Sequence, residues 1–360
     1  MPPTTSHSPQ PDLYEPISGP SLTAGQLPRG AAPLTLTVVV LAALGLWLSG
    51  WNPAACAVLG ALTYTAVIYV WSRVVEGSRK ATDRLVTAVV TCAFLLALLP
   101  LISVMVTVLS KGLVRFDAEF FTNSMRGVTG EGGGVYHAII GTLIITGFAA
   151  LISVPVGMLT AIYLVEYGRG KLARAITFFV DVMTGIPSIV AGLFAFALFA
   201  LFFGPGVRMG IMGSIALSVL MIPVVVRSTE EMLKLVPNEL REAAYALAVP
   251  KWRTILKVVL PTALAGIATG VTLAIARVMG ETAPLLIAVG ITSGDNFNPF
   301  DGRMATLSVF SYYQYVNPGF PPQPALDRAW AAALVLIIIV MLLNLVARLI
   351  SRLFAPKTRG

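Results

Sequence analysis

Long apolar runs separated by short polar segments dominate this sequence. Eight such runs can be delimited, at 33–50, 54–72, 85–110, 138–166, 176–204, 210–228, 262–290 and 329–350. An apolar helix of about 18 residues or more is long enough to cross a hydrocarbon layer about 30 Å thick. The pattern therefore predicts an all-α, polytopic helical membrane protein. The first two runs are short and are joined by Gly50-Trp51-Asn52-Pro53, which favours a helical hairpin that either spans the bilayer or lies partly in its interface.

Composition supports the membrane assignment. Of the 360 residues, 56% are hydrophobic and 12% are charged, whereas soluble domains carry about a quarter charged residues. Cys56 and Cys92 both lie in apolar runs and are interpreted as small apolar side chains rather than as a disulfide framework. His7 and His137 stand alone, so no metal site is expected.

The distribution of basic residues predicts the orientation. Of the 25 Lys and Arg residues, 18 fall in the N-terminal tail and the segments on its side of the membrane, and 6 fall in the segments on the other side. Cytoplasmic loops carry the excess of Lys and Arg, which places both termini in the cytoplasm. The net charge of +8 is thus explained by topology and gives no reason to expect nucleic-acid binding.

One charged segment, 241–261, lies between two apolar runs. Glu242 to Leu247 favours helix, Pro250 marks a break, and Lys251 to Val259 can resume a helix before Pro261 opens the next span. Two interpretations are open. The segment is either a solvated connector or a rigid cytoplasmic projection that binds a partner protein. In the second case Glu242 is an anionic anchor, and the small residues at 243 and 244 allow the partner to approach closely.

The same segment resembles the EAA loop of ABC-transporter permeases. It has Glu242-Ala243-Ala244 and Leu260-Pro261 at the family spacing, but Ala248 stands where the family usually has Gly. The stretches 154–167, 185–193, 227–237 and 276–286 are similar to the phosphate-specific permease family, PstA. Gly280-Glu281-Thr282-Ala283-Pro284 discriminates best between that family and other permeases.

The resemblance implies a fold and a domain organisation. It predicts a type I ABC importer permease domain over 85–350, with six core transmembrane helices and a cytoplasmic coupling loop at 229–261. The hairpin at 33–72 is an addition to that core. The Pro-, Ser-, Thr- and Gly-rich segment 1–32 is predicted to be a disordered cytoplasmic tail, and 351–360 a C-terminal tail. The tail does not resemble a cleavable signal peptide.

The resemblance also implies which proteins assemble with this chain. The partners are a second permease, PstC, two copies of the ATPase PstB, and the external binding protein PstS, which delivers phosphate. The coupling contacts to the ATPase fall on Glu242, Ala243, Ala244, Ala248, Lys251 and Trp252. The chain itself is expected to bind no cofactor, and ATP with Mg²⁺ is bound by the ATPases. Gly168-Arg169-Gly170-Lys171 is not a phosphate-binding loop of the Walker A type, because Leu172 follows the Lys and the upstream Gly is missing.

Ionisable residues inside the apolar runs are candidates for the substrate path. Arg277 and Glu281 are four residues apart and are expected to share one helical face, either as a structural ion pair or as groups lining an anion path. Thr282 adds a hydroxyl to this path. Ser188 follows Pro187 in mid-span, where the alternatives are a helix kink and a substrate-facing hydroxyl. Asp181 is interpreted as packed against another helix or a partner subunit.

Two further polar regions of the sequence can be interpreted as structural or as partner-binding surfaces. The cluster Arg227, Glu230, Glu231 and Lys234 is interpreted as a solvated helix face that supports the coupling loop. The outer loops 111–137 and 291–328 are rich in aromatic residues, which either anchor the chain at the interface or dock an external partner.

Two alternatives to a phosphate importer remain. One is a permease for another oxyanion, sulfate or molybdate, which shares the EAA loop; the Gly-Glu-Thr-Ala-Pro stretch argues against it. The other is a channel or proton-coupled carrier that uses Arg277 and Glu281 as its relay and needs no ATPase. An enzymatic role is disfavoured because the sequence has no triad, metal cluster or paired catalytic acids.

Overall fold

The computed structural model describes residues 26–28 and 30–354, with side chains described as far as Leu349. Every regular element in this part of the chain is a helix, so the all-α prediction is confirmed. The sequence-predicted tails fall largely outside the described residues, at 1–25 and 355–360. Residues 351–354, assigned above to the C-terminal tail, belong to the last helix, α14 (Gln323–Phe354).

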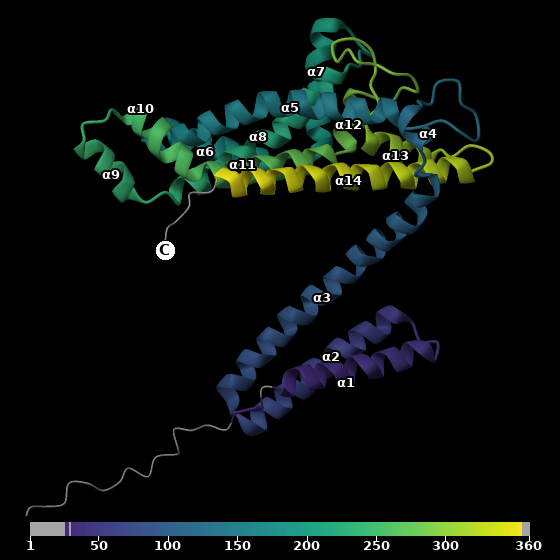
Figure 1. Cartoon of the computed structure of the whole chain (residues 1–360), viewed down its shortest axis with the longest axis vertical. Coiled ribbons are helices and arrows are strands. Elements are labelled where there is room, and N and C mark those ends of the chain that lie inside the picture. Colours follow the sequence, from purple (N-terminus) through teal and green to yellow (C-terminus); the bar gives the residue numbers. More distant parts are fainter. Residues whose placement is uncertain (1–25, 29, 355–360) are drawn as a thin grey trace, which may run out of the picture. The chain divides into compact units, whose positions relative to one another are not determined.

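The chain divides into two compact units, Met1–Met105 and Val106–Gly360, and the boundary falls within the long helix α3 (Ser78–Gly112; Figure 1). The first unit, unit 1, contains a hairpin of α1 (Ala31–Leu48) and α2 (Pro53–Val75). Asn52 caps α2 by accepting a hydrogen bond from the Ala54 N–H at 2.9 Å. Pro53 suits the first helical position because it needs no intrahelical donor there. The two short apolar runs thus correspond to α1 and α2.

Glu76 connects three parts of unit 1. Its carboxylate accepts two hydrogen bonds from Arg84, at 2.5 and 2.9 Å, one from Ser72 Oγ at 2.8 Å, and one from the Leu27 N–H at 3.0 Å. The Arg84 guanidinium, aided by the other two donors and opposed by burial, lowers the pKa of Glu76 from 4.5 to about 2. This contact ties the segment before α1 to the turn between α2 and α3.

A pH dependence follows from the depressed pKa of Glu76. The carboxylate is ionised in the folded state far below pH 4.5, so its stabilising contribution is fully present above pH 4.5 and is lost as the pH falls towards about 2. We expect hydrogen exchange of the amides at 76–84, corrected for intrinsic rates, to accelerate over this window. Glu76→Gln should remove the pH dependence. An unchanged dependence in that variant would contradict the assignment to Glu76.

The second unit, unit 2, is a helical bundle. α5 (Tyr136–Ile162) packs along α8 (Gly210–Lys234), α8 also packs on α11 (Leu260–Met279), and α11 packs on α14. The apolar core between them includes Ile145, Met212, Leu217, Met221 and Val225. Seven helices of the described chain are long and apolar enough to span a membrane, or eight if one bent pair is counted as a span.

The bent pair corrects the span predicted at 176–204. That run forms α6 (Lys171–Thr184) and α7 (Ser188–Phe203), which meet at 107°. Pro187 accounts for the break, because its ring clashes with the carbonyl four residues earlier and disfavours helical geometry at Ile186. The chain turns sharply at Gly185, and α7 stands away from the long axis of the bundle in Figure 1.

The span predicted at 262–290 is wrong at both ends. At its C-terminal end α11 stops at Met279, and a separate helix, α12 (Ala283–Ala288), follows. Pro284 explains the stop, since it lacks the N–H that would bond the carbonyl of Gly280. Glu281 therefore lies in a break, so the prediction that it shares a helical face with Arg277 is wrong. α12 packs against α7, where a Cβ at Gly192 would lie 2.6 Å from the Pro284 Cα.

At its N-terminal end the same span is longer than predicted. α10 (Lys251–Thr254) runs through a π-helical segment, η3 (Ile255–Val259), into α11, and the whole of Lys251–Met279 is one candidate span. The helix expected to resume at Lys251 to Val259 is thus continuous with α11. A second π-helical segment, η2 (Tyr163–Tyr167), ends α5. Such segments are rare and concentrate at functional sites.

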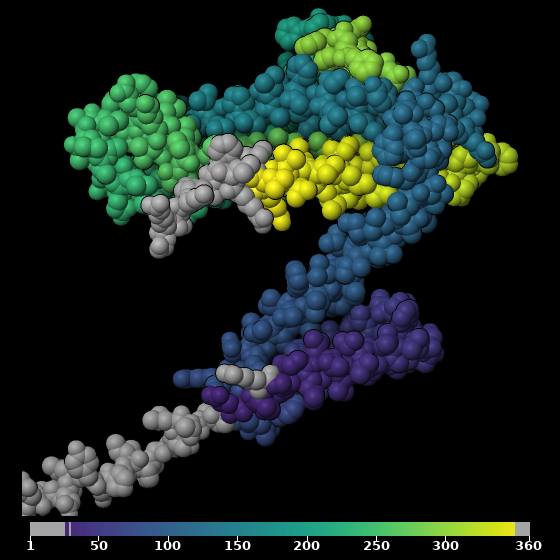
Figure 2. Space-filling view, viewed as in Figure 1, coloured from purple at the N-terminus to yellow at the C-terminus, as the bar shows by residue number. Residues whose placement is uncertain are grey.

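Unit 2 has two distinct ends. At one end lie the short helices η1 (Leu113–Arg115), α4 (Ala118–Thr122) and α13 (Leu307–Val316). Arg328 is buried there and donates to the carbonyls of Gly130 and Gly132 at 2.7 and 3.0 Å. At the other end α9 (Asn238–Ala246) and α10 project beyond the bundle, drawn in green in Figures 1 and 2.

Candidate coupling and translocation sites

The coupling loop predicted from the sequence is built on α9. Its first turn follows Pro237, whose fixed φ and missing N–H suit a helix start, and Glu239 in that turn complements the helix dipole. Glu242 and Ala243 are exposed, whereas Ala244 is buried against the rest of the unit. The Glu-Ala-Ala triplet therefore presents two residues outward and uses the third for packing.

α9 ends in a Schellman motif centred on Ala248. The Val249 N–H bonds the Ala244 carbonyl at 3.1 Å and the Ala248 N–H bonds the Tyr245 carbonyl at 2.9 Å. This motif needs a residue in the left-handed region directly after the helix, which is why Gly is preferred there. Ala248 takes that place with a φ of 57°, and it is the one non-Gly residue with positive φ in the described chain. The turn is thus made despite the Cβ.

We expect Ala248→Gly to stabilise the turn. An L-residue in the left-handed region costs about 1–2 kcal/mol, and the extra freedom of Gly in the unfolded chain offsets about 0.4–1 kcal/mol of that gain. The net effect should raise protection of the 238–250 amides against hydrogen exchange. Ala246→Gly is the matched control, because Gly within the helix costs about 1 kcal/mol relative to Ala. Destabilisation by both variants would contradict the strain at Ala248.

Arg241 fastens α9 to the bundle. Its guanidinium pairs with Glu166 in η2 at 2.9 Å and donates to the carbonyls of Leu233 and Val236 at 3.0 and 2.7 Å. The side chains of Arg241 and Glu166 are only 13% and 5% exposed. Because a buried charge is costly unless paired and hydrogen-bonded, this contact fixes the position of α9 relative to α5 and α8.

Lys251 and Trp252, both predicted coupling residues, face different ways. The Lys251 ammonium donates to the Glu166 carbonyl and lies 4.8 Å from the centre of the Tyr167 ring, so it is engaged within the chain. Trp252 is exposed, with the Arg253 guanidinium 5.3 Å from its ring. Leu247, at 80% exposure, and Tyr245 are also exposed. The loop thus presents three large apolar or aromatic side chains to its surroundings, with Glu242 close to them in sequence.

A charge network lies along α8 just before this loop. Arg227 pairs with Asp181 of α6 and with Glu230 at 2.8 Å, and Glu230 also accepts from Lys234 at 2.6 Å. Glu231 is exposed, as expected of a solvated face, but Glu230 is buried. Asp181 packs against another helix, one of the two arrangements predicted for it. The network therefore links α6 to the C-terminal end of α8.

A second candidate site is a polar cavity of about 230 Å³ within unit 2. It is lined by residues from the α6–α7 break, α8 and the C-terminal end of α11: Met183, Thr184, Ile186, Ser188, Leu220, Pro223, Val224, Arg277, Val278 and Glu281. Three of the predicted path residues thus meet at one place. The fourth, Thr282, directly precedes α12 and is not among the lining residues.

The two charged residues of this cavity do not neutralise each other. Within the described part of the chain, Arg277 and Glu281 form no ion pair, and neither side chain has another hydrogen-bonding partner. Glu281 is held through its backbone, whose carbonyl accepts from Ser308 Oγ at 2.8 Å. The Arg277 guanidinium, which presents several donors in a fork, is therefore free to bind an oxyanion.

Both helix breaks of unit 2 border this cavity. The α6–α7 break contributes Ile186 and Ser188, and the break after α11 contributes Glu281. Irregular backbone at membrane depth is tolerated where it lines a cavity or is buried in protein. The positive end of the α7 dipole also lies at Ser188, beside Arg277. The arrangement suits a small anion.

Comparison with known proteins identifies the family. The family of binding-protein-dependent transport system inner membrane components matches residues 153–360. The phosphate transport system permease protein PstA 1 of Mycobacterium tuberculosis (strain ATCC 25618 / H37Rv) is 46% identical over 284 residues, covering 78% of this chain and 91% of that protein. PstA of Mycobacterium leprae (strain TN) is 48% identical over 278 residues, covering 76% and 90%. This chain belongs to the PstA family.

A PstA-family chain is a multi-pass inner-membrane permease with the fold of an ABC importer component. Among solved structures, the chain is similar to a chain of the MetNI methionine ABC transporter in an inward-facing conformation. That similarity has 22% sequence identity and a TM-score of 0.47, and covers 62% of this chain and 95% of that one.

Sequence reasoning missed two residues of this PstA-family chain, Glu166 and Arg241. Both carried a signal: Glu166 is a lone acid at the end of an apolar run, and Arg241 directly precedes Glu242. They are 75 residues apart in sequence, and nothing in the spacing pairs them. Only the folded arrangement of η2 beside α9 brings them together.

Proposed function

We propose that this chain is a transmembrane permease subunit of an ABC importer for inorganic phosphate in the bacterial plasma membrane. The observation that carries the proposal is its 46% identity to a phosphate transport permease over 91% of that protein's length. The free Arg277 in a cavity bordered by two helix breaks supports it, since a guanidinium binds the oxygens of a phosphate in a bidentate manner.

The proposed path is shared with a second permease, PstC. The cavity of this chain supplies Ser188, Arg277 and Glu281 to the path, with Thr282 at its edge. Arg277 binds the anion, and Glu281 sets how strongly the site attracts it, because an acid next to an Arg lowers the local positive potential. Two small side-chain hydroxyls, of Ser188 and Thr282, add donors for phosphate oxygens.

The proposed coupling element is the projecting α9 loop. It inserts its exposed Glu242, Ala243 and Trp252 into a groove of an ATPase, PstB, of which the complex holds two copies. ATP and Mg²⁺ are bound by those ATPases. Arg241 and Lys251 hold the loop to η2, so a movement imposed on α9 is transmitted to α5 as well as to α8 and α11.

The proposed orientation places both termini and α9 in the cytoplasm, following the excess of Lys and Arg. The opposite end of unit 2, with α4 and α13, then faces the binding protein PstS. Exposed aromatic residues at that end, including Tyr313, Tyr315 and Phe320, support a docking surface as well as interface anchoring.

The test is reconstitution of the complex with its permease partner, ATPases and binding protein in proteoliposomes, followed by phosphate and sulfate uptake with and without ATP. Phosphate-selective, ATP-dependent uptake is the expected result. A preference for sulfate would overturn the substrate, and uptake without ATP or partners would move the chain to the carrier class. Glu242→Lys should release the ATPases from the membrane, and full co-purification with that variant would contradict the docking role of α9.

A further inference from the structure

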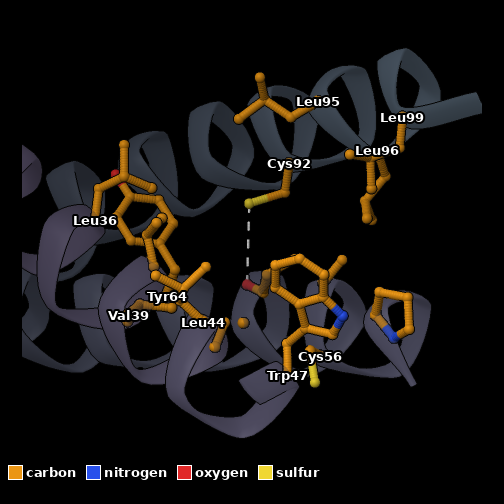
Figure 3. A pocket seen from close by; sticks show the side chains of 16 residues that line it. Leu36, Val39, Leu44, Trp47, Cys56, Tyr64, Cys92, Leu95, Leu96 and Leu99 are labelled. Carbon is orange, nitrogen blue, oxygen red and sulfur yellow. Dashed lines mark hydrogen bonds between the residues drawn. The ribbon is translucent and has the colours of Figure 1, made fainter. Parts of the chain in front are cut away.

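Unpaired charge, rather than apolar space, marks a further candidate ligand site in this chain. Unit 1 has a groove of about 430 Å³ between its three helices, where the Cys92 thiol lies 3.9 Å from the Ala61 carbonyl oxygen (Figure 3). None of the described residues that line this groove is charged, so its chemistry points to no particular ligand. Unpaired cationic side chains that come together are found in unit 2 instead.

Two arginines of unit 2 meet around Gly290, the second residue after α12. A Cβ built on Gly290 would lie 2.9 Å from Arg208 Nη1, 3.2 Å from Arg208 Cδ and 3.6 Å from Arg303 Cδ. In each arginine the guanidinium carbon is two bonds beyond Cδ, so both cationic groups lie around the same recess. Gly290 has a φ of 76°, so both its backbone conformation and the lack of space favour Gly. Arg208 and Arg303 are called the arginine pair below.

The arginine pair has no counter-charge. Within the described part of the chain, neither arginine forms an ion pair. The two acids of the loop that carries Arg303, Asp295 and Asp301, are exposed and pair with neither. The N-terminal end of α8, two residues after Arg208, adds the positive end of its dipole. Two cations held close together repel each other, so the arrangement favours an anion between them.

The other basic residues assigned to the outer side do not form such a pair. These outer segments are poor in basic residues, with 6 of the 25 in the chain. Arg126 is exposed and forms no ion pair among the described residues. Three more are engaged within the chain by a tryptophan ring, an ion pair or carbonyl oxygens: Lys111, Arg115 and Arg328. The convergence of Arg208 and Arg303 is therefore not a consequence of a generally basic surface.

The backbone that carries the arginine pair is fixed. The Ile211 N–H at the start of α8 donates to the Pro299 carbonyl at 2.8 Å, which joins the α7–α8 connection to the loop after α12. Gly210 is buried at this junction, where a Cβ would lie 3.1 Å from the Pro299 Cα. Asn296 Nδ2 donates to the Arg303 carbonyl at 3.0 Å. Both side chains thus start from held positions while their guanidinium groups stay unpaired.

The arginine pair lies at the opposite end of α8 from the coupling loop. α8 has 25 residues and is about 37 Å long, more than the ~30 Å thickness of a hydrocarbon core. Leu220 and Val224, which line the polar cavity, follow Arg208 by roughly 18–24 Å along this helix. α12 connects the two places, because Glu281 borders the cavity before it and Gly290 lies at the arginine pair after it. In the proposed orientation the arginine pair is therefore on the outer side of the cavity.

We propose that Arg208 and Arg303 form an outer binding site for inorganic phosphate, which the anion occupies before it reaches Arg277. The inference rests on the proposed function, since it takes phosphate as the substrate. Each guanidinium can donate two hydrogen bonds to a tetrahedral oxyanion, so two of them can hold it from two sides. Arg208 is half-buried and Arg303 is exposed, which leaves the site open to an anion that arrives from outside.

Protection from phenylglyoxal, a reagent that modifies guanidinium groups, tests this binding directly. The full complex in nanodiscs, without ATP or binding protein, is treated in inorganic phosphate or in potassium chloride of the same ionic strength. Modification of each arginine is then measured by peptide mass spectrometry. We expect phosphate to slow modification of Arg208 and Arg303 and to leave the exposed Arg126 unchanged. Equal modification of the pair in both salts would overturn the proposal.

Single variants test whether the two arginines share one anion. Arg303→Gln should raise the phosphate concentration that halves Arg208 modification about tenfold, because a hydrogen bond to a charged group is lost. Arg208→Gln should have the same effect at Arg303, whereas Arg126→Gln is the matched control and should have none. Arg303 is exposed and is held through its carbonyl, so its substitution should leave the fold intact. Unchanged protection of Arg208 in Arg303→Gln would contradict a shared site.

Two parallel measurements separate this inference from its alternatives. Phosphate uptake by the reconstituted complex without any protection of the arginine pair would reject the outer site and leave the proposed function standing. Protection in a complex that imports sulfate instead of phosphate would reject the proposed function and leave the pair as an oxyanion site. Weaker retention of the binding protein by Arg208→Gln, with protection of Arg303 unchanged, would assign the pair to acidic side chains of that protein and overturn the proposal.

Discussion

Phosphate uptake is expected to fall about 10- to 150-fold when Arg277 is replaced by Gln, because hydrogen bonds to a charged group contribute about 1.5–3 kcal/mol and each 1.4 kcal/mol is a factor of ten. The complex should still assemble. Within the described residues the Arg277 side chain has no ion pair or hydrogen bond, so its removal leaves no buried group unsatisfied. Initial rates of uptake in proteoliposomes, with co-purification of the partners, measure both outcomes.

Conservative variants separate charge from geometry at this position. Arg277→Lys retains a cation but cannot contact two phosphate oxygens from one plane, so its uptake should lie between that of the unaltered chain and Arg277→Gln. Normal uptake by Arg277→Gln would remove Arg277 from the path. Loss of assembly would instead give it a structural role.

The second large effect is expected at the buried pair that holds α9. Arg241→Met leaves the Glu166 carboxylate, only 5% exposed, without its guanidinium partner. Breaking a buried pair from one side costs about 3–5 kcal/mol, which should loosen α9 and abolish transport-coupled ATP hydrolysis. ATPase activity stimulated by the loaded binding protein, with hydrogen exchange at 238–250, reports the loss of coupling and its cause.

The double variant Arg241→Met with Glu166→Leu distinguishes a charge effect from a packing effect. Removing both charges eliminates the unpaired carboxylate, so part of the stability should return. Recovery should be incomplete, because the carbonyls of Leu233 and Val236 still lose their donor. Arg174→Met, an exposed Arg on α6, is the matched control and should have no effect. Equal loss in single and double variants would contradict the charge-pair account.

Apolar runs are a sufficient signal for the helices of this chain but not for where they break. The spans at 33–50, 54–72 and 138–166 agree with α1, α2 and α5, because each run is bounded by polar or turn residues. The run 176–204 conceals a 107° bend, since hydropathy averages over Pro187. Pro284 similarly ends α11 early and displaces Glu281 from the helix.

Some residues of the candidate sites could likewise be predicted from the sequence, and others could not. Ser188, Arg277 and Glu281 could be chosen from the sequence because charge and hydroxyl groups are unusual inside apolar runs, and the structure brings these three residues to one cavity. The positive φ of Ala248 is indicated only by the Gly that the family usually has at that position, because Ala itself has no preference for positive φ. The Arg241–Glu166 contact could not be foreseen, because it depends on the packing of segments distant in sequence.

The π-helical segment η3 has a consequence for any helical wheel drawn through the span Lys251–Met279. A single π-turn inserts one extra residue into the α-helical count, and one residue corresponds to about 100° around the axis. Every side chain beyond Val259 is therefore rotated by about 100° from the azimuth that an uninterrupted helix starting at Lys251 would give it. Because α11 is held by its packing on α8 and α14, deletion of one residue within 255–259 would turn Lys251 and Trp252 by about 100° relative to Arg277.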